Sequence, residues 1–258
     1  MKLTTLKDQL YYSTVMIESL GDNTAGTAFF IARNFEGVGG RIYLVTNKHV
    51  VFGKQNCQIR FHKATSIKPE VRSGDFIYKF SENEWINGWK YHENPEVDLA
   101  VFNLTDIMAS LFVQNQYIFY RCLSTDMIPT KEQAISISAM ERIFFVGYPN
   151  AFRDQVNNLP IARSGYLATP LSIDFEGKET FLLDASIFEG SSGSPICIIN
   201  ENYETYTDES GNVKIEGRYL LAGVNSSTFT RTSDNEYLDL GYAWKAHKIL
   251  EIMNQNQI

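Results

Sequence analysis

The chain has 258 residues, of which 44% are hydrophobic and 21% are charged. These fractions are ordinary for globular domains, and they exclude a mainly disordered, collagen-like or membrane-spanning chain. The 30 acidic residues outnumber the 23 basic ones and give a net charge of −7. This sign disfavours nucleic acid as a partner, because a phosphate backbone attracts basic proteins. At about 150 residues per domain, the length allows one large body or two modest ones.

The first twenty residues contain many apolar side chains but interrupt them with Lys7, Asp8 and Gln9. A secretory signal requires a continuous apolar stretch, which this segment lacks. We therefore expect a cytoplasmic protein that does not bind a membrane. Within this segment, Thr4–Leu10 is expected to form a short helical turn.

Most of the chain consists of short apolar or alternating runs separated by Gly, Asn, Asp and Ser. This pattern is typical of half-buried strands and predicts a mainly β fold. In chain order, the predicted strands are residues 14–17, 27–32, 41–46, 58–62, 99–104, 143–147, 164–168, 180–183, 195–199 and 219–225. This number of strands is sufficient for two barrels.

Between Leu111 and Glu141 the regular alternation of short apolar runs with Gly, Asn, Asp and Ser ends, and Pro129 and a polar run occur. We place the crossing between two halves there. The predicted division is an N-terminal barrel (1–115), a crossing (116–140), a C-terminal barrel (141–241) and a final helix (242–258).

The end of the chain contains two further features. The polar stretch 200–218, with Gly211-Asn212 near its middle, is compatible with either a long hairpin or a disordered loop. A helix is predicted for residues 242–254, because Trp244, Leu250 and Met253 share one face and no Gly or Pro intervenes.

The chain has three cysteines: Cys57, Cys122 and Cys197. They are too far apart in sequence to form a zinc-binding motif, and an odd number of cysteines does not favour a disulfide framework. We interpret them as buried free thiols. The segment 92–96 begins His-Glu but has Glu where a metalloprotease helix has its second His. The sequence therefore predicts neither a metal site nor a cofactor.

The segment 188–195 is the most informative chemically, because small residues surround Gly190 and Gly193 between apolar runs. A serine nucleophile needs its hydroxyl on a tight turn, with backbone N–H groups directed at the oxyanion that forms. Glycine permits both the bend and the close approach. Ser192 fits this place, although such a segment taken alone is more often an ordinary glycine-serine turn.

Two other segments change this interpretation. His49 ends an apolar strand, and Asp98 begins another, where a buried carboxylate would need a partner. Either residue alone would ordinarily be structural. The order His49, Asp98, Ser192 in a β-rich chain of two halves is, however, hard to obtain by chance.

These segments resemble the motifs of chymotrypsin-fold (trypsin-like) serine peptidases, in particular the bacterial branch that includes the HtrA-like peptidases. The matching segments are residues 26–31 for the first-barrel strand, 46–50 for the histidine motif, 97–101 for the aspartate motif and 145–149 for the turn that opens the second barrel. Residues 190–195 resemble the nucleophile motif Gly-Asp/Asn-Ser-Gly-Gly-Pro but depart from it at Ser191 and Ser194.

The resemblance implies two six-stranded antiparallel β-barrels of the chymotrypsin type, followed by a C-terminal helix. It also implies that Ser192 attacks the scissile carbonyl of a protein or peptide substrate, that His49 moves the proton and that Asp98 orients the imidazole. The backbone N–H groups of Gly190 and Ser192 would form the oxyanion hole. The oligomeric state is left open.

The residues that the resemblance assigns to substrate binding are Ser186, Ser226, Ser227, Thr228 and Glu189. Ser186 would lie at the base of the pocket for the side chain that precedes the cut. Its hydroxyl offers no charge to pair with Lys or Arg, so we expect a small or apolar side chain there. A carboxylate from Asp184 or Glu189 would instead favour a basic one.

Two other functions are compatible with the same residues. The first is a catalytically silent chymotrypsin-fold module that binds a peptide by strand addition. The second is an esterase or acyltransferase that uses the same nucleophile. Labelling by a fluorophosphonate separates an enzyme from a silent module, and a comparison of peptide with ester turnover separates the enzymes.

Overall fold

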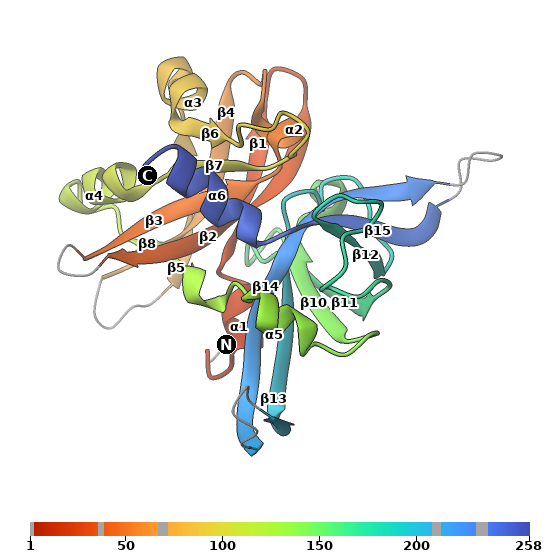
Figure 1. Cartoon of the computed structure of the whole chain (residues 1–258). Coiled ribbons are helices and arrows are strands. Elements are labelled where there is room, and N and C mark those ends of the chain that lie inside the picture. Colours follow the sequence, from red (N-terminus) through yellow and green to blue (C-terminus); the bar gives the residue numbers. More distant parts are fainter. Residues whose placement is uncertain (1–2, 36–38, 67–71, 208–212, 231–236) are drawn as a thin grey trace.

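The structure is a computed structural model that describes residues 3–35, 39–66, 72–207, 213–230 and 237–258. It consists of two β-rich halves joined by a crossing with short helical segments (Figure 1). The predicted mainly β class with a C-terminal helix is confirmed. None of the helices in the described part of the chain combines the length and apolar character of a transmembrane span.

The strands of the first half are β1 (Thr14–Ser19), β2 (Thr24–Phe35), β3 (Gly39–Thr46), β4 (Cys57–Ala64), β5 (Arg72–Lys79), β6 (Trp89–Tyr91), β7 (Ala100–Asn103), β8 (Ile118–Phe119) and β9 (Leu123–Ser124). The strands of the second half are β10 (Arg142–Gly147), β11 (Ile161–Leu167), β12 (Thr180–Asp184), β13 (Pro195–Thr207), β14 (Val213–Thr230) and β15 (Tyr237–Lys245). The helices are α1 (Leu6–Leu10), α2 (Lys48–Val51), α3 (Glu82–Gly88), α4 (Thr105–Val113), α5 (Lys131–Ile135) and α6 (His247–Gln255), with 3-10 turns at η1 (Thr125–Met127) and η2 (Pro149–Ala151).

The two halves differ in how their strands are arranged. The second half is a closed six-stranded barrel in the order β10-β11-β12-β15-β14-β13, as the resemblance implies. The first half is a nine-stranded sheet whose main path runs β5-β4-β1-β2-β3-β7-β6. The main path already has seven strands, one more than the predicted six, and two two-residue strands join the sheet after α4: β8 pairs with β4, and β9 pairs with β2.

Two segments near the end of the chain differ in detail from the sequence prediction. The C-terminal helix begins at His247 rather than at Tyr242, because residues 237–245 form β15 and close the barrel between β12 and β14. The polar stretch 200–218 is a hairpin of β13 and β14, paired as far as Thr207 and Val213. Residues 208–212, which include Gly211 and Asn212, lie outside the described residues.

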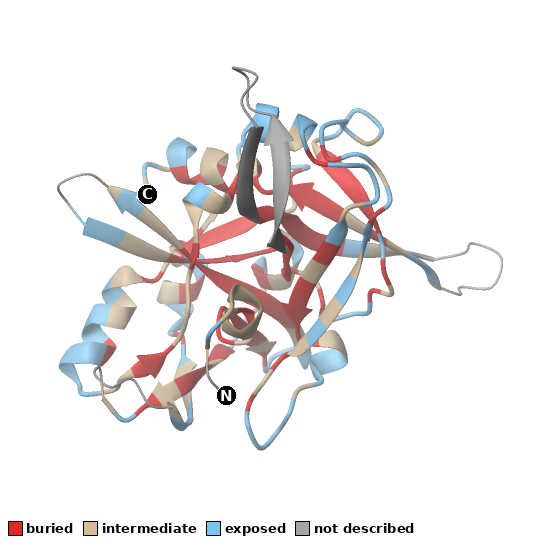
Figure 2. Ribbon diagram, turned by 90° about the horizontal axis from the view of Figure 1, so that it is seen from below, coloured by how far each residue is buried: buried red, intermediate tan, exposed pale blue. Residues whose placement is uncertain are grey.

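Buried residues concentrate in the strands of the molecule (Figure 2). Their side chains form a core within each half, a third core between the halves and a smaller cluster of Tyr12, Ala64 and Phe119. Phe29 and Tyr43 of the first half pack in this third core with Val224 of the second half and with Ile252 of α6. Burial of such apolar area is the main force that holds two layers together. The line of contact between the halves is therefore firmly packed, and it is where the candidate site lies.

Candidate active site

His49 and Asp98 lie side by side because of the pairing between β3 and β7. Thr46, the last residue of β3, pairs with Ala100, the first residue of β7. His49 follows in the single turn of α2, and Asp98 lies in the loop before β7. His49 Nδ1 is 2.7 Å from Asp98 Oδ2, and the backbone N–H of His49 donates to Asp98 Oδ1 at 2.9 Å.

Two other side chains fix Asp98. Asn47 Nδ2 donates to the Asp98 backbone carbonyl at 2.8 Å, and the Ser226 hydroxyl donates to Asp98 Oδ2 at 2.7 Å. Burial raises the pKa of the Asp98 carboxyl, but the hydrogen bonds and charge of His49, together with the Ser226 hydroxyl, lower this pKa below its ordinary value. The arrangement therefore favours an ionised Asp98 beside the imidazole.

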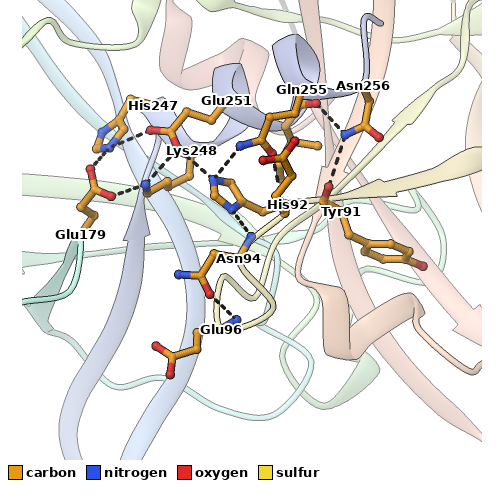
Figure 3. Close-up of polar contacts among 12 residues, drawn as sticks. Tyr91, His92, Asn94, Glu96, Glu179, His247, Lys248, Glu251, Gln255 and Asn256 are labelled. Atoms are coloured by element: carbon orange, nitrogen blue, oxygen red, sulfur yellow. Dashed lines mark hydrogen bonds and ion pairs between the residues drawn. The ribbon is translucent and has the colours of Figure 1, made fainter.

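The loop that carries Asp98 is anchored to α6, which follows the last strand of the other half (Figure 3). The contacts are His92 Nε2 to Glu251 Oε2 (2.8 Å), the Glu93 backbone N–H to Gln255 Oε1 (3.1 Å) and Asn256 Nδ2 to the Tyr91 carbonyl (3.3 Å). The placement of Asp98 thus depends on the C-terminal helix as well as on β7.

Ser192 lies on the turn between β12 and β13, and two glycines permit this turn. Gly190 and Gly193 have φ values of 82° and 88°, a region that glycine adopts without strain. A Cβ on Gly193 would lie 1.9 Å from the Thr27 carbonyl oxygen, so no other residue fits there. Ser192, Gly190 and His49 line one pocket of about 220 Å³. The structure therefore brings together the three residues predicted for catalysis.

The Ser192 hydroxyl itself donates to the backbone carbonyl of Ser226 at 2.8 Å. Among the hydrogen bonds of the described residues, none joins Ser192 Oγ to His49. Transfer of the hydroxyl proton to His49 would require rotation about the Cα–Cβ bond of Ser192, which moves between staggered rotamers.

The backbone N–H groups of Gly190 and Ser192 are both unused in the described part of the chain. The Glu189 carbonyl accepts from the Asn150 N–H at 2.6 Å, and a trans peptide then directs the Gly190 N–H the opposite way. Likewise, the Ser191 carbonyl accepts from Asn225 Nδ2 at 3.0 Å, which orients the Ser192 N–H. The two predicted oxyanion donors are therefore available for a ligand.

The residues expected to bind substrate occupy varied positions. Glu189 is exposed and lines the pocket beside Ser192, whereas Ser186 is half-buried and Ser227 is exposed, both outside the lining of this pocket. The Thr228 hydroxyl donates to the Leu240 carbonyl at 3.2 Å. The Ser226 hydroxyl is directed at Asp98, a role that sequence patterns do not indicate.

The remaining part of the pocket beside Ser192 is formed by the first half of the chain. Its other lining residues are Ile17, Ser19, Thr24, Ala25, Gly26, Val50 and Lys54. Lys54 Nζ is paired with the Asp22 carboxylate, so its charge is compensated. The pocket therefore offers mainly apolar and small side chains to a bound chain.

A second polar cluster lies at the start of α6 (Figure 3). Ligand atoms of Glu179, His247 and Glu251 lie within 4.8 Å of one another. Lys248 Nζ contacts a carboxylate oxygen of both Glu179 and Glu251. Because an ammonium group already compensates these two carboxylates, we describe the cluster as an ion-pair network.

Comparisons with known proteins identify the family and the fold of the chain. The sequence model of a family described as "Trypsin-like peptidase domain" matches residues 26–202. Among curated proteins, no sequence matches the chain. Deg5 is 18% identical with a TM-score of 0.51, and the match covers 95% of this chain and 89% of that one. This likeness shows a shared fold.

Two other solved structures match at lower TM-scores. The protease domain of MamO from Magnetospirillum magneticum is 12% identical with a TM-score of 0.49, covering 94% of this chain and 96% of that one. An inactive form of Rv3671c from M. tuberculosis is 16% identical with a TM-score of 0.48, covering 95% and 87%.

Proposed function

The chain belongs to the trypsin-like peptidase domain family, and from this premise we propose that it is a serine endopeptidase acting through Ser192, His49 and Asp98. The observation that carries the proposal is the 2.7 Å contact between His49 Nδ1 and Asp98 Oδ2, together with the pocket that His49 and Ser192 both line. A protein or peptide is the substrate class, and no cofactor is required.

In the proposed acylation step, Ser192 Oγ forms a bond to the scissile carbonyl carbon while its proton moves to His49 Nε2. The oxyanion that results accepts hydrogen bonds from the Gly190 and Ser192 N–H groups. His49 then gives the proton to the leaving nitrogen as the C–N bond breaks, which releases an amine and leaves an ester on Ser192. Asp98 stabilises the imidazolium throughout.

Deacylation repeats these events with water in place of the serine. His49 takes a proton from water as the water oxygen bonds to the ester carbon. The same proton returns to Ser192 Oγ as the ester bond breaks, which releases the carboxylic acid. Both steps require a neutral imidazole at the start, so acid should stop the reaction.

The test is hydrolysis of a peptide library by the purified chain beside its Ser192→Ala and His49→Ala variants. Both variants should lose turnover by at least about 10⁴-fold, and the double variant should be little worse than either, because the residues act as a unit. Ser110→Ala, on the exposed face of α4, is the matched control. Robust turnover by Ser192→Ala would overturn the proposal.

A silent peptide-binding module is the second candidate, since the Ser192 hydroxyl donates to Ser226 O and not to His49. A fluorophosphonate probe distinguishes the two, because only an activated serine reacts with it. Stoichiometric labelling that Ser192→Ala abolishes supports the enzyme. Absence of labelling, together with peptide binding, supports the module. Turnover of simple esters without turnover of peptides would indicate an esterase.

We extend the proposal to primary specificity. By the resemblance, Ser186 lies at the base of a site for the side chain before the cut, and Ser227 and Thr228 lie along its wall; this site is separate from the pocket of about 220 Å³ that Glu189 lines. These side chains are small and uncharged, so a small or apolar residue is expected before the cut. A cleavage profile dominated by Lys and Arg would contradict this expectation and implicate Asp184 or Glu189 as the counter-charge.

A further inference from the structure

Thr27 of β2 is completely buried, and each of its polar groups forms a hydrogen bond. Its hydroxyl donates to the Gly190 carbonyl at 2.8 Å and accepts from the Tyr148 N–H at 3.0 Å. Its backbone N–H donates to the Ser192 carbonyl at 2.9 Å. One residue of the first half therefore holds the carbonyl groups of both residues that supply the proposed oxyanion donors.

The hydroxyl contact matters most for Gly190, because a glycine at positive φ has little conformational restraint of its own. The peptide after Gly190 is held directly by the Thr27 hydroxyl. The peptide before Gly190 is held by the Asn150 N–H, which donates to the Glu189 carbonyl. Asn150 follows Tyr148 by two residues, and the Tyr148 N–H donates to the same Thr27 hydroxyl. The Thr27 hydroxyl thus holds the peptide after Gly190 directly and the peptide before it indirectly, through the segment from Tyr148 to Asn150.

Thr27 also contacts the part of the chain that leads to His49. The Thr46 hydroxyl donates to the Thr27 carbonyl at 2.6 Å, and Thr46 is the last residue of β3, three residues before His49. The same carbonyl oxygen would lie 1.9 Å from a Cβ placed on Gly193. Thr27 therefore lies between the strand that leads to the proposed base and the turn that carries the proposed nucleophile.

From these contacts we infer that Thr27 is a positioning residue: its hydroxyl sets the direction of the Gly190 N–H toward the oxyanion of the transition state. The inference rests on the proposed function and adds a residue to it. A hydroxyl can donate one hydrogen bond and accept others, which is what Gly190 and Tyr148 require. Valine has the same shape but can do neither, whereas serine retains both.

The test measures peptide hydrolysis by Thr27→Val, Thr27→Ser and the wild-type chain, with kcat normalised to active sites titrated with the fluorophosphonate. Loss of a complete oxyanion donor costs about 10²- to 10³-fold in kcat, and a misdirected donor should cost less. We expect Thr27→Val to lower kcat about 10- to 100-fold, with KM within about twofold, because a donor that acts on the oxyanion stabilises mainly the transition state.

Three controls separate positioning from general destabilisation. Thr27→Ser should recover kcat to within about threefold of wild type, since the hydroxyl is retained. Thr180→Val removes another fully buried threonine hydroxyl, which donates to the Lys178 carbonyl within the second half, and should leave kcat per titrated site unchanged. If Thr27→Val does not fold, Thr27→Cys replaces it, because a thiol of similar size is a weak donor.

The outcomes are distinct for the two proposals. A Thr27→Val or Thr27→Cys enzyme with kcat within threefold of wild type overturns the inference, as does a Thr27→Ser enzyme as impaired as Thr27→Val. Neither result affects the assignment of Ser192. If the wild-type chain shows no turnover that depends on Ser192, the proposed function fails, and the role of Thr27 fails with it.

Discussion

We predict that removal of the hydrogen bond from the Ser226 hydroxyl to Asp98 lowers both stability and activity. Ser226 is buried, and its Oγ lies 2.7 Å from Asp98 Oδ2, the oxygen that also faces His49 Nδ1. Ser226→Ala removes this donor and leaves the Ser226 carbonyl, which accepts from Ser192, in place. The substitution therefore perturbs the aspartate without touching the backbone contact of the serine.

A hydrogen bond to a charged group contributes about 1.5 to 3 kcal/mol. The Asp98 side chain is 25% exposed, so water can replace part of the bond, and we expect a loss near the lower end, about 1.5 kcal/mol. If the same free energy is lost from the transition state, kcat/KM falls about tenfold. Ser110→Ala on α4 should change the free energy of unfolding by less than about 0.5 kcal/mol.

The free energy of unfolding that Ser226→Ala loses should decrease as the pH falls. The folded-state pKa of Asp98 is lowered, so its contribution to stability is present above the ordinary value of 3.8 and is lost as pH falls through the folded pKa. Without the Ser226 hydroxyl this pKa rises toward 3.8. Urea unfolding should show the largest difference from wild type at pH 7 and a smaller one near pH 3. Equal stability and equal kcat/KM at pH 7 would refute the reasoning.

Three further predictions concern the rest of the structure. Gly193→Ala should lower the free energy of unfolding by about 3 kcal/mol or more, because its Cβ would lie 1.9 Å from the Thr27 carbonyl oxygen; a stable variant in urea titration would contradict the turn geometry. Burial raises the pKa of Cys57 to about 11 and that of the other two cysteines to about 12, so iodoacetamide at pH 8 should alkylate all three slowly in the native protein and rapidly in urea. Glu251→Gln should reduce stability by less than about 1 kcal/mol, because its side chain is partly exposed. The effect should shrink in high salt, and a salt-independent loss would contradict an ionic contact with Lys248.

Local sequence patterns were sufficient to predict much of the β structure. The apolar run at β12 and the alternation of apolar and polar residues in β4 indicate strands, because burial of one or both faces requires those residues. The alternation places His62 on the outer face of β4, but the structure buries it. The glycines at 190 and 193 indicate a tight turn because few other residues adopt positive φ. The candidate catalytic residues His49, Asp98 and Ser192 could also be predicted locally, because each lies in a short motif near the end of a strand.

What the sequence by itself could not determine is which distant groups meet. Ser226 and Asp98 are 128 residues apart, and Thr27 and Gly190 are 163 residues apart. A serine or threonine in a strand has the same local signature whether its hydroxyl faces a neighbour, solvent or a nucleophile turn. Its partner is set by the register of each sheet and by the packing of one half on the other. Only the tertiary structure therefore assigned Ser226 to Asp98 and Thr27 to the turn that carries Ser192.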